Sequence, residues 1–191
     1  MVLRFSDDFL KVLEFSRDEA MRTGWHNIAV DHIILGILRQ SGNGACRALE
    51  ALGQDLTAFK CSLDESLSTD GPVAWDERES VHLCDGALSM LQHAALEMAR
   101  CGATYLETQH FLFAVSRIAG SYSHDYLDDC GISLRALVEA SGLEWASYGL
   151  DRKPVMPNES ETNALPDPAL LAEAIEQRLR EGYTTENPLV S

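Results

Sequence analysis

The chain has 191 residues, enough for one domain or two small ones with a real core, and its 15 basic against 30 acidic side chains give a formal net charge of −15. This balance argues against binding to nucleic acid or to an anionic membrane, because both need clustered basic side chains. Hydrophobic residues make up 46% of the chain but aromatic residues only 7%, which favours an aliphatic, helical core.

The first predicted helix begins near Asp7 and runs to Thr23, where Gly24 is a typical left-handed stop. One face of this segment repeats at the helical period and is expected to point inward. It comprises Phe9, Val12, Leu13, Ser16 and Ala20. Phe5, just before the helix, is placed to pack on Phe9 as a hydrophobic staple.

The second predicted helix, over 31–39, is apolar on nearly all sides and should be the buried centre of its unit. Gly42 breaks the chain after it. A short third helix then ends at Gly53, and a fourth begins at Asp55, which is a good N-cap residue. No strand-like alternation is long enough to matter, so the predicted fold class is all-α.

The same pattern returns 78 residues later, because 5–63 align with 83–141 without a gap and 13 of the 59 positions are identical. The glycine stops and the apolar phases also match, giving a second set of helices from Asp85, over 109–117, up to Gly131 and from Ser133. We therefore predict a tandem duplication of a four-helix unit, with copy one at 4–63 and copy two at 81–143, packed with pseudo-twofold symmetry.

The rest of the chain is predicted to be connecting sequence and one further helix. Residues 64–80 read as an acidic linker within a domain of residues 1–143, and 144–191 as a polar tail. A helix at about 168–181 has apolar residues at i, i+4 and i+8, namely Leu171, Ile175 and Leu179. Docking of this stripe on the repeat domain is the preferred interpretation. The alternative is a helix that engages a partner, or that fills the domain's own groove until displaced.

No catalytic motif is visible. A phosphate-binding loop needs Gly-Lys-[Ser/Thr], but Lys11, Lys60 and Lys153 follow other residues, so the chain is not a P-loop ATPase. The cysteines are Cys46, Cys61, Cys84, Cys101 and Cys130, with no CxxC pair, as expected for reduced residues of a cytoplasmic protein. No signal peptide, membrane span, nucleophile elbow or closed Cys/His site is present in the sequence, so we expect no enzyme activity, no cofactor and no metal.

Two histidines and a few aromatic residues allow more than one interpretation. His32 and His110 each open a mostly apolar helix, so we expect buried imidazoles, with a metal or small-ligand sensor as the alternative. Trp25 follows the Gly24 stop, where it either contacts a partner or packs locally. Tyr122 and Tyr126 are expected to fill the interface between the two copies.

Two copies of such a unit resemble the Clp N-terminal repeat domain, the substrate- and adaptor-binding domain of ClpA-, ClpB- and ClpC-type unfoldases. The stretch DEAMRTGWHNIAVDHIILGILR most resembles the ClpC type, and the likeness covers roughly 4–143. The family opens its second helix with Thr-Glu-His, and here those positions hold Val30-Asp31-His32 and Thr108-Gln109-His110. No ATPase module follows.

The resemblance implies a non-catalytic module that binds a Clp unfoldase, an adaptor or a protein substrate and modulates ATP-dependent proteolysis. In ClpC-type domains the Thr-Glu pairs resemble a phosphoarginine pocket, but here Val30 lacks the hydroxyl and Gln109 lacks the carboxylate that would pair with a guanidinium. The expected groove residues are Trp25, Asp31, Thr108 and Gln109. The alternative is the detached N-terminal domain of a longer Clp ATPase, although the ordinary start and end of the chain favour a complete protein.

Overall fold

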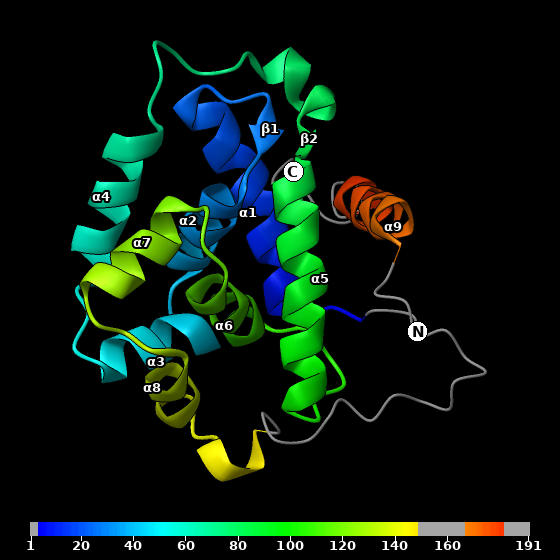
Figure 1. Ribbon diagram of the computed structural model, residues 1–191. Coiled ribbons are helices and arrows are strands. Elements are labelled where there is room, and N and C mark those ends of the chain that lie inside the picture. Colours follow the sequence, from blue (N-terminus) through cyan, green and yellow to red (C-terminus); the bar gives the residue numbers. More distant parts are fainter. Residues whose placement is uncertain (1–3, 149–166, 182–191) are drawn as a thin grey trace, which may run out of the picture.

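The computed structural model describes residues 4–148 and 167–181 (Figure 1). Its α-helices are α1 (Asp7–Thr23), α2 (Val30–Gln40), α3 (Gly44–Ala51), α4 (Leu56–Leu67), α5 (Asp85–Arg100), α6 (Thr108–Arg117), α7 (Tyr122–Asp129), α8 (Leu134–Ala140) and α9 (Pro168–Glu181). Two 3-10 helices, η1 (Trp75–Ser80) and η2 (Trp145–Ser147), and two short strands, β1 (Asn27–Ile28) and β2 (His82–Leu83), complete the described elements. The predicted all-α class is confirmed.

Helix α1 begins and ends where local chemistry requires. The Ser6 hydroxyl accepts a hydrogen bond from the backbone N–H of Phe9 at 3.2 Å. At the other end Gly24 has φ of +88°, and a Cβ there would lie 2.3 Å from the carbonyl oxygen of Gly71. Only glycine meets both demands. The Phe5 ring stacks on Phe9 with 5.8 Å between centroids, which confirms the predicted staple.

Helices α2 and α6 form the centre of the molecule, as their apolar character predicted. Residues 30–38 of α2 are all buried. Close packing of α2 on α1 depends on Gly36, because a Cβ at this position would lie 2.6 Å from both the carbonyl oxygen of Val12 and the hydroxyl of Ser16. Any side chain here would therefore push the two helices apart.

The helices of the two predicted copies begin at the 78-residue offset. Helices α1 and α5 begin at Asp7 and Asp85, and α2 and α6 begin at Val30 and Thr108. The short helices α3 and α7 are offset by 78 at both ends. The element order is thus the same in both units, while their origin by duplication stays a prediction.

Two short backbone contacts join the units reciprocally. Phe5 pairs with Leu106, and Ile28 pairs with Leu83, both in parallel. In each case the segment before the first helix of one unit lies beside the segment before the second helix of the other. Each unit therefore satisfies backbone groups of its neighbour.

The two tyrosines of α7 lie at the interface between the units. The Tyr126 ring stacks on Phe59 of α4 with 4.1 Å between centroids. The Tyr122 hydroxyl lies 2.6 Å from the hydroxyl of Ser62 on the same helix. This confirms the prediction that these tyrosines fill the contact between copies.

The segment 64–80, predicted to be a solvated linker, packs on the domain. Its first residues continue α4 to Leu67, and the backbone N–H groups of Thr69 and Val73 donate to the carbonyls of Thr23 and Met21 at 3.0 and 2.8 Å. Arg78 in η1 is only 5% exposed. The excess of acidic residues predicted solvent exposure, but these contacts hold the segment against the end of α1.

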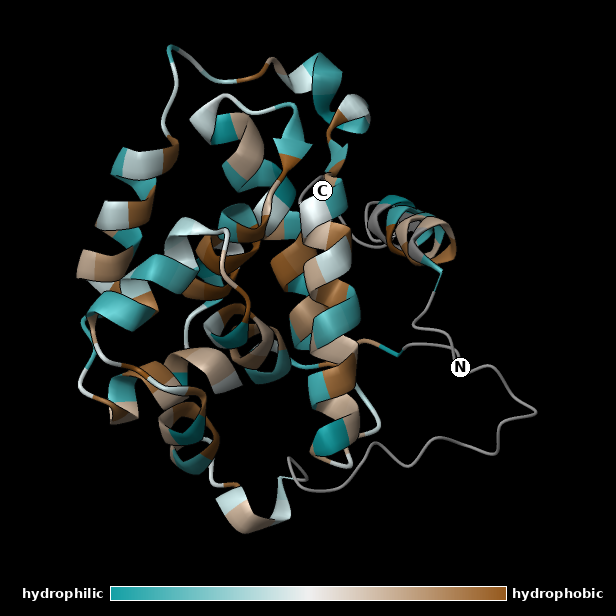
Figure 2. Ribbon diagram, in the orientation of Figure 1, coloured by the Kyte–Doolittle hydropathy of each residue, from teal (hydrophilic) through white to brown (hydrophobic). Residues whose placement is uncertain are grey.

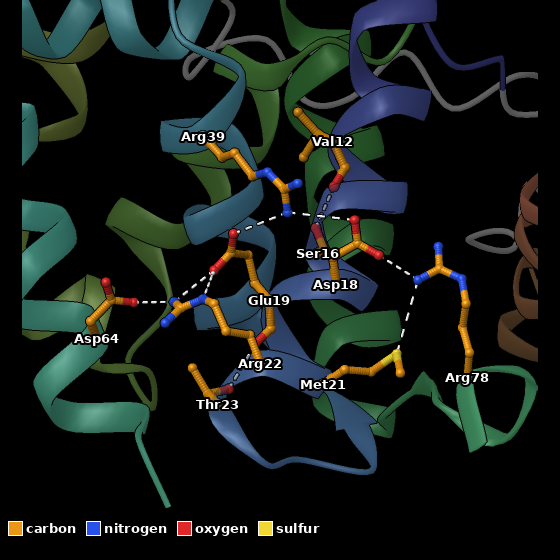
Figure 3. Close-up of polar contacts among 10 residues, drawn as sticks. All are labelled: Val12, Ser16, Asp18, Glu19, Met21, Arg22, Thr23, Arg39, Asp64 and Arg78. Atoms are coloured by element: carbon orange, nitrogen blue, oxygen red, sulfur yellow. Dashed lines mark hydrogen bonds and ion pairs between the residues drawn. The ribbon is translucent and has the colours of Figure 1, made fainter. Parts of the chain in front are cut away.

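A chain of alternating charges strengthens this attachment (Figure 3). Glu19 of α1 is 3% exposed and contacts Arg22 at 2.7 Å and Arg39 of α2 at 3.3 Å. Further contacts, Arg22 with Asp64, Arg39 with Asp18 and Asp18 with Arg78, extend the network. Carboxylates of an acidic chain thus hold α1 to α2, α4 and η1.

Helix α9 lies beside α5 (Figure 1) and contacts both α5 and α1. It carries hydrophobic and hydrophilic residues together (Figure 2). Near the end of the first described range, Tyr148 is buried, and its hydroxyl donates to the Glu97 carboxylate. The remainder of the predicted polar tail, 149–166 and 182–191, lies outside the described residues.

The two helix-opening histidines serve the fold. His32 Nδ1 accepts a hydrogen bond from the backbone N–H of Ala29 at 2.9 Å, and its Nε2 lies 3.1 Å from the Thr23 hydroxyl. His110 Nδ1 accepts in the same way from Glu107 at 3.0 Å. A ring nitrogen that accepts an N–H is unprotonated, so both imidazoles fit the neutral form. Burial lowers the pKa of His32 and of His110 to about 4.

We predict that acid destabilises the fold before its ordinary carboxylates titrate. A histidine whose pKa falls from 6.5 unfolded to about 4 folded binds protons more readily in the unfolded chain. Its stabilising effect is complete above pH 6.5 and is lost as the pH falls toward 4. Between pH 7 and pH 5 the free energy of unfolding should fall by about 2 kcal/mol for each of the two histidines, measured by urea denaturation.

The matched variants are His32→Gln and His26→Gln, because His26 is exposed. The loss of stability between pH 7 and pH 5 should shrink by about half in His32→Gln, since one of the two buried imidazoles is gone, and stay unchanged in His26→Gln. An equal loss in both variants would show that His32 does not drive the pH dependence.

Candidate functional site

Of the four residues predicted to line a groove, three lie at the starts of α2 and α6, and Trp25 lies in the loop after α1. Two of the four cap helices of the opposite unit. Asp31 is 8% exposed. Its carboxylate accepts from the backbone N–H groups of Tyr122 and Ser123 at 3.1 and 2.8 Å, and from the Ser123 hydroxyl at 2.6 Å. Thr108 is 2% exposed, and its hydroxyl accepts from the Ala45 N–H at 3.1 Å. Both side chains thus stabilise the domain by accepting hydrogen bonds from backbone N–H groups.

The other two predicted residues have some exposed surface. The Trp25 indole N–H donates to the carbonyl of Leu67 at 2.7 Å, and its ring meets His32 edge-on at 5.5 Å. Trp25 is nevertheless 38% exposed. Gln109 is half-buried, and its amide donates to the Glu107 carboxylate. Trp25 therefore ties the end of α4 to the loop after α1 while presenting part of its ring to solvent.

The possible metal ligands and two of the cysteines can be placed in the described part of the chain. Within 4–148 and 167–181, no three His, Cys, Asp or Glu side chains form a group that could hold a metal ion. Burial raises the pKa of the Cys46 thiol to about 11 and that of Cys101 to about 12, so both stay protonated near neutral pH. In the same ranges no helix has the length and hydropathy needed to cross a bilayer.

A surface formed by α1 and α5 holds the helix α9, and we name it the α1–α5 face. Leu171 and Ile175, two members of the predicted stripe, are 3% and 1% exposed there. The side chain of Leu179, the third member, lies outside the described residues. Burying two such aliphatic side chains contributes about 1.5–3 kcal/mol each. A helix of this length is marginal alone in water, so its contacts with the face help to keep it helical.

An ion pair accompanies the apolar contacts. Arg17 of α1 is 1% exposed, and its Nη2 lies 2.7 Å from Oε2 of Glu176 on α9. The other oxygen of Glu176 lies 3.2 Å from Nδ1 of His82, which is half-exposed at the start of β2. A buried arginine is costly unless it meets a carboxylate. The α1–α5 face therefore combines an aliphatic contact with a site for one negative charge.

The ion pair between Arg17 and Glu176 was not predicted from the sequence. Arg17 lies four residues after Leu13 on the inner side of α1, and a charge in an apolar stripe is a signal that a buried counter-charge exists. Which of the 30 acidic residues supplies it depends on how α9 meets α1, and periodicity does not reveal that.

Comparisons with known proteins agree with this architecture. Residues 4–130 match the family described as the Clp repeat (R) N-terminal domain. The chain is 30% identical over 131 residues to the negative regulator of genetic competence ClpC/MecB of Bacillus subtilis, and 28% identical over 131 residues to the chaperone protein ClpB of Oceanobacillus iheyensis. In both cases the match covers 69% of this chain and 16% of the relative.

A solved structure supports the fold alone. A chain titled "Peptide from EAEC T6SS Sci1 SciI protein" superposes with a TM-score of 0.52 at 17% identity, over 75% of this chain and 83% of that one.

We predict that the cap supplied by Asp31 is a major stabilising contact. In Asp31→Ala the first two backbone N–H groups of α7 lose their acceptor in a buried place, which should lower the free energy of unfolding by about 3 kcal/mol. Urea denaturation at pH 7 measures this. Asp129→Ala, an exposed position on the same helix, should change it by less than about 0.5 kcal/mol. Equal effects in the two variants would contradict the capping role.

Proposed function

Since this chain belongs to the family of the Clp repeat (R) N-terminal domain, we propose that it is a non-catalytic protein-interaction module. It binds a Clp-type unfoldase, an adaptor or a protein substrate in the cytoplasm, and it thereby modulates ATP-dependent proteolysis. The chain spans about 16% of the length of the relatives ClpB and ClpC/MecB that it matches.

One observation carries this proposal beyond family membership, namely that the α1–α5 face holds a helix. Two aliphatic side chains and one carboxylate of α9 take part in the described contact. This is the way in which helical segments of other proteins are recognised, through apolar anchors four residues apart. Elsewhere on the domain, Trp25 in the loop after α1 and Gln109 at the start of α6 have surface that a partner can reach.

The main alternative is that the same domain works as the substrate-recruiting front of a longer Clp ATPase. The small share of the relatives that it covers favours this second candidate. An immunoblot of native cells with an antibody to this chain separates the two: a band near 21.1 kDa supports a separate module, and only a much larger band supports the alternative.

The metal or small-ligand sensor draws no support from the two helix-opening histidines. Both ring nitrogens of His32 already have partners, and His110 accepts a backbone hydrogen bond. We therefore place the function in protein binding.

We predict that the purified chain changes proteolysis without hydrolysing ATP. Added in excess to the Clp unfoldase and peptidase of the same cells, it should change the degradation rate of an unfolded, fluorescently labelled protein at least about twofold, because it occupies a partner on the delivery route. By itself it should release no phosphate from ATP, since no lysine of the sequence stands in a P-loop.

Calorimetric titration of the chain with unfoldase, adaptor and unfolded substrate identifies which of them it binds. The Asp31→Ala variant, tested at a temperature where it is partly unfolded, should lose the effect in proportion to the unfolded fraction. Absence of binding to all three classes, together with an unchanged degradation rate, would refute the proposed function.

A further inference from the structure

Few of the described side chains of α9 are buried against the domain. Of its described side chains, Leu171 and Ile175 are buried, whereas Leu170 is 64% exposed and most of the others face solvent. The described contacts are made by the buried Leu171 and Ile175, the partly buried Ala172 and the carboxylate of Glu176.

Arg17 makes the face selective. With α9 docked, its guanidinium is 1% exposed, and among the described residues its Nε has no hydrogen-bond partner. The position 78 residues later, on α5, is Ala95, so the charge is present on one unit only. A ligand of this face must therefore bring a carboxylate to α1, in a fixed register with its apolar anchors.

The N-terminus of α9 is capped by its own segment and not by the α1–α5 face. The Asp167 carboxylate accepts from the Ala169 N–H at 2.9 Å, and Pro168 occupies the first helical position. Residues 149–166 join α9 covalently to the domain that holds it. Docking of α9 is intramolecular, so it needs less contact than the binding of a separate helix would.

We propose that α9 is a displaceable intramolecular ligand of the α1–α5 face. The partner that replaces it is an amphipathic helix with two aliphatic residues four apart and a carboxylate directly after the second. This inference rests on the proposed function for the existence of such a partner, while the docking and release of α9 stand on the contacts of Arg17, Leu171 and Ile175. In this arrangement α9 sets a threshold, because only a partner helix that outcompetes the tethered copy gains the face.

The test uses the full chain and a fluorescein-labelled synthetic peptide of residues 167–181. In the released variant, Leu171→Ser with Ile175→Ser, the chain's own α9 loses its anchors and the face becomes free for the peptide. Fluorescence anisotropy should show that the peptide binds this variant at least tenfold more tightly than the unaltered chain. The matched control is Leu170→Ser, which alters the neighbouring exposed leucine and should behave like the unaltered chain.

A second arm isolates the charge and guards against misfolding of the released variant. A peptide carrying Glu176→Gln should bind the released variant at least fivefold more weakly than the natural peptide, since Arg17 loses its carboxylate. The full chain with Glu176→Gln keeps both apolar anchors and should bind the natural peptide more tightly than the unaltered chain does. Circular dichroism of every variant monitors the helical fold.

Two outcomes would overturn the inference. Equal peptide binding by the unaltered chain, the released variant and Leu170→Ser would show that α9 does not occupy the peptide's site. A protein partner found by calorimetry that binds all three equally, and that the peptide does not displace, would show that partners use another surface, which leaves the proposed function intact. Conversely, tenfold tighter peptide binding with no protein partner of any class would refute the proposed function and leave the docking of α9 in place.

Discussion

The first backbone N–H groups of a helix need acceptors from outside that helix, and here α3 and α7 take some of theirs from the opposite four-helix unit. Asp31 accepts from two N–H groups of α7, and Thr108 accepts from one of α3. The segments at Phe5 and Ile28 also join the two units, because each pairs its backbone with a segment of the other unit. Neither unit is therefore satisfied without the other, and the positions of the central helices α2 and α6 follow.

This mutual dependence also limits what the starts of α2 and α6 can do. A carboxylate that holds two helix N–H groups in a buried place is already committed, and moving it to a partner would leave both unpaired. The α1–α5 face differs from these helix starts, because it already holds another helix, α9. There the domain retains one buried charge, that of Arg17, which a second helix must neutralise.

Much of the fold was predictable because its signals are local. Gly24 ends α1, since only glycine adopts this left-handed backbone so close to Gly71. The burial of α2 follows from apolar residues that lie a few positions apart in the sequence. The linker was predicted less well. Its acids look solvated in the sequence, yet Asp64 and the buried Arg78 belong to a network with side chains of α1 that are distant in the chain.

The sequence by itself determined the class of the fold, the order and stops of the helices, the absence of a P-loop and the likeness to Clp N-terminal repeats, because each depends on residue type and short spacing. Only the tertiary structure decided that Asp31 and Thr108 cap helices of the opposite unit, and that Glu176 reaches Arg17 across 159 positions. The physical reason is that the net charge of −15 does not say which basic residue each acidic residue contacts. Pairing depends on which surfaces meet, and that is settled by packing over the whole molecule.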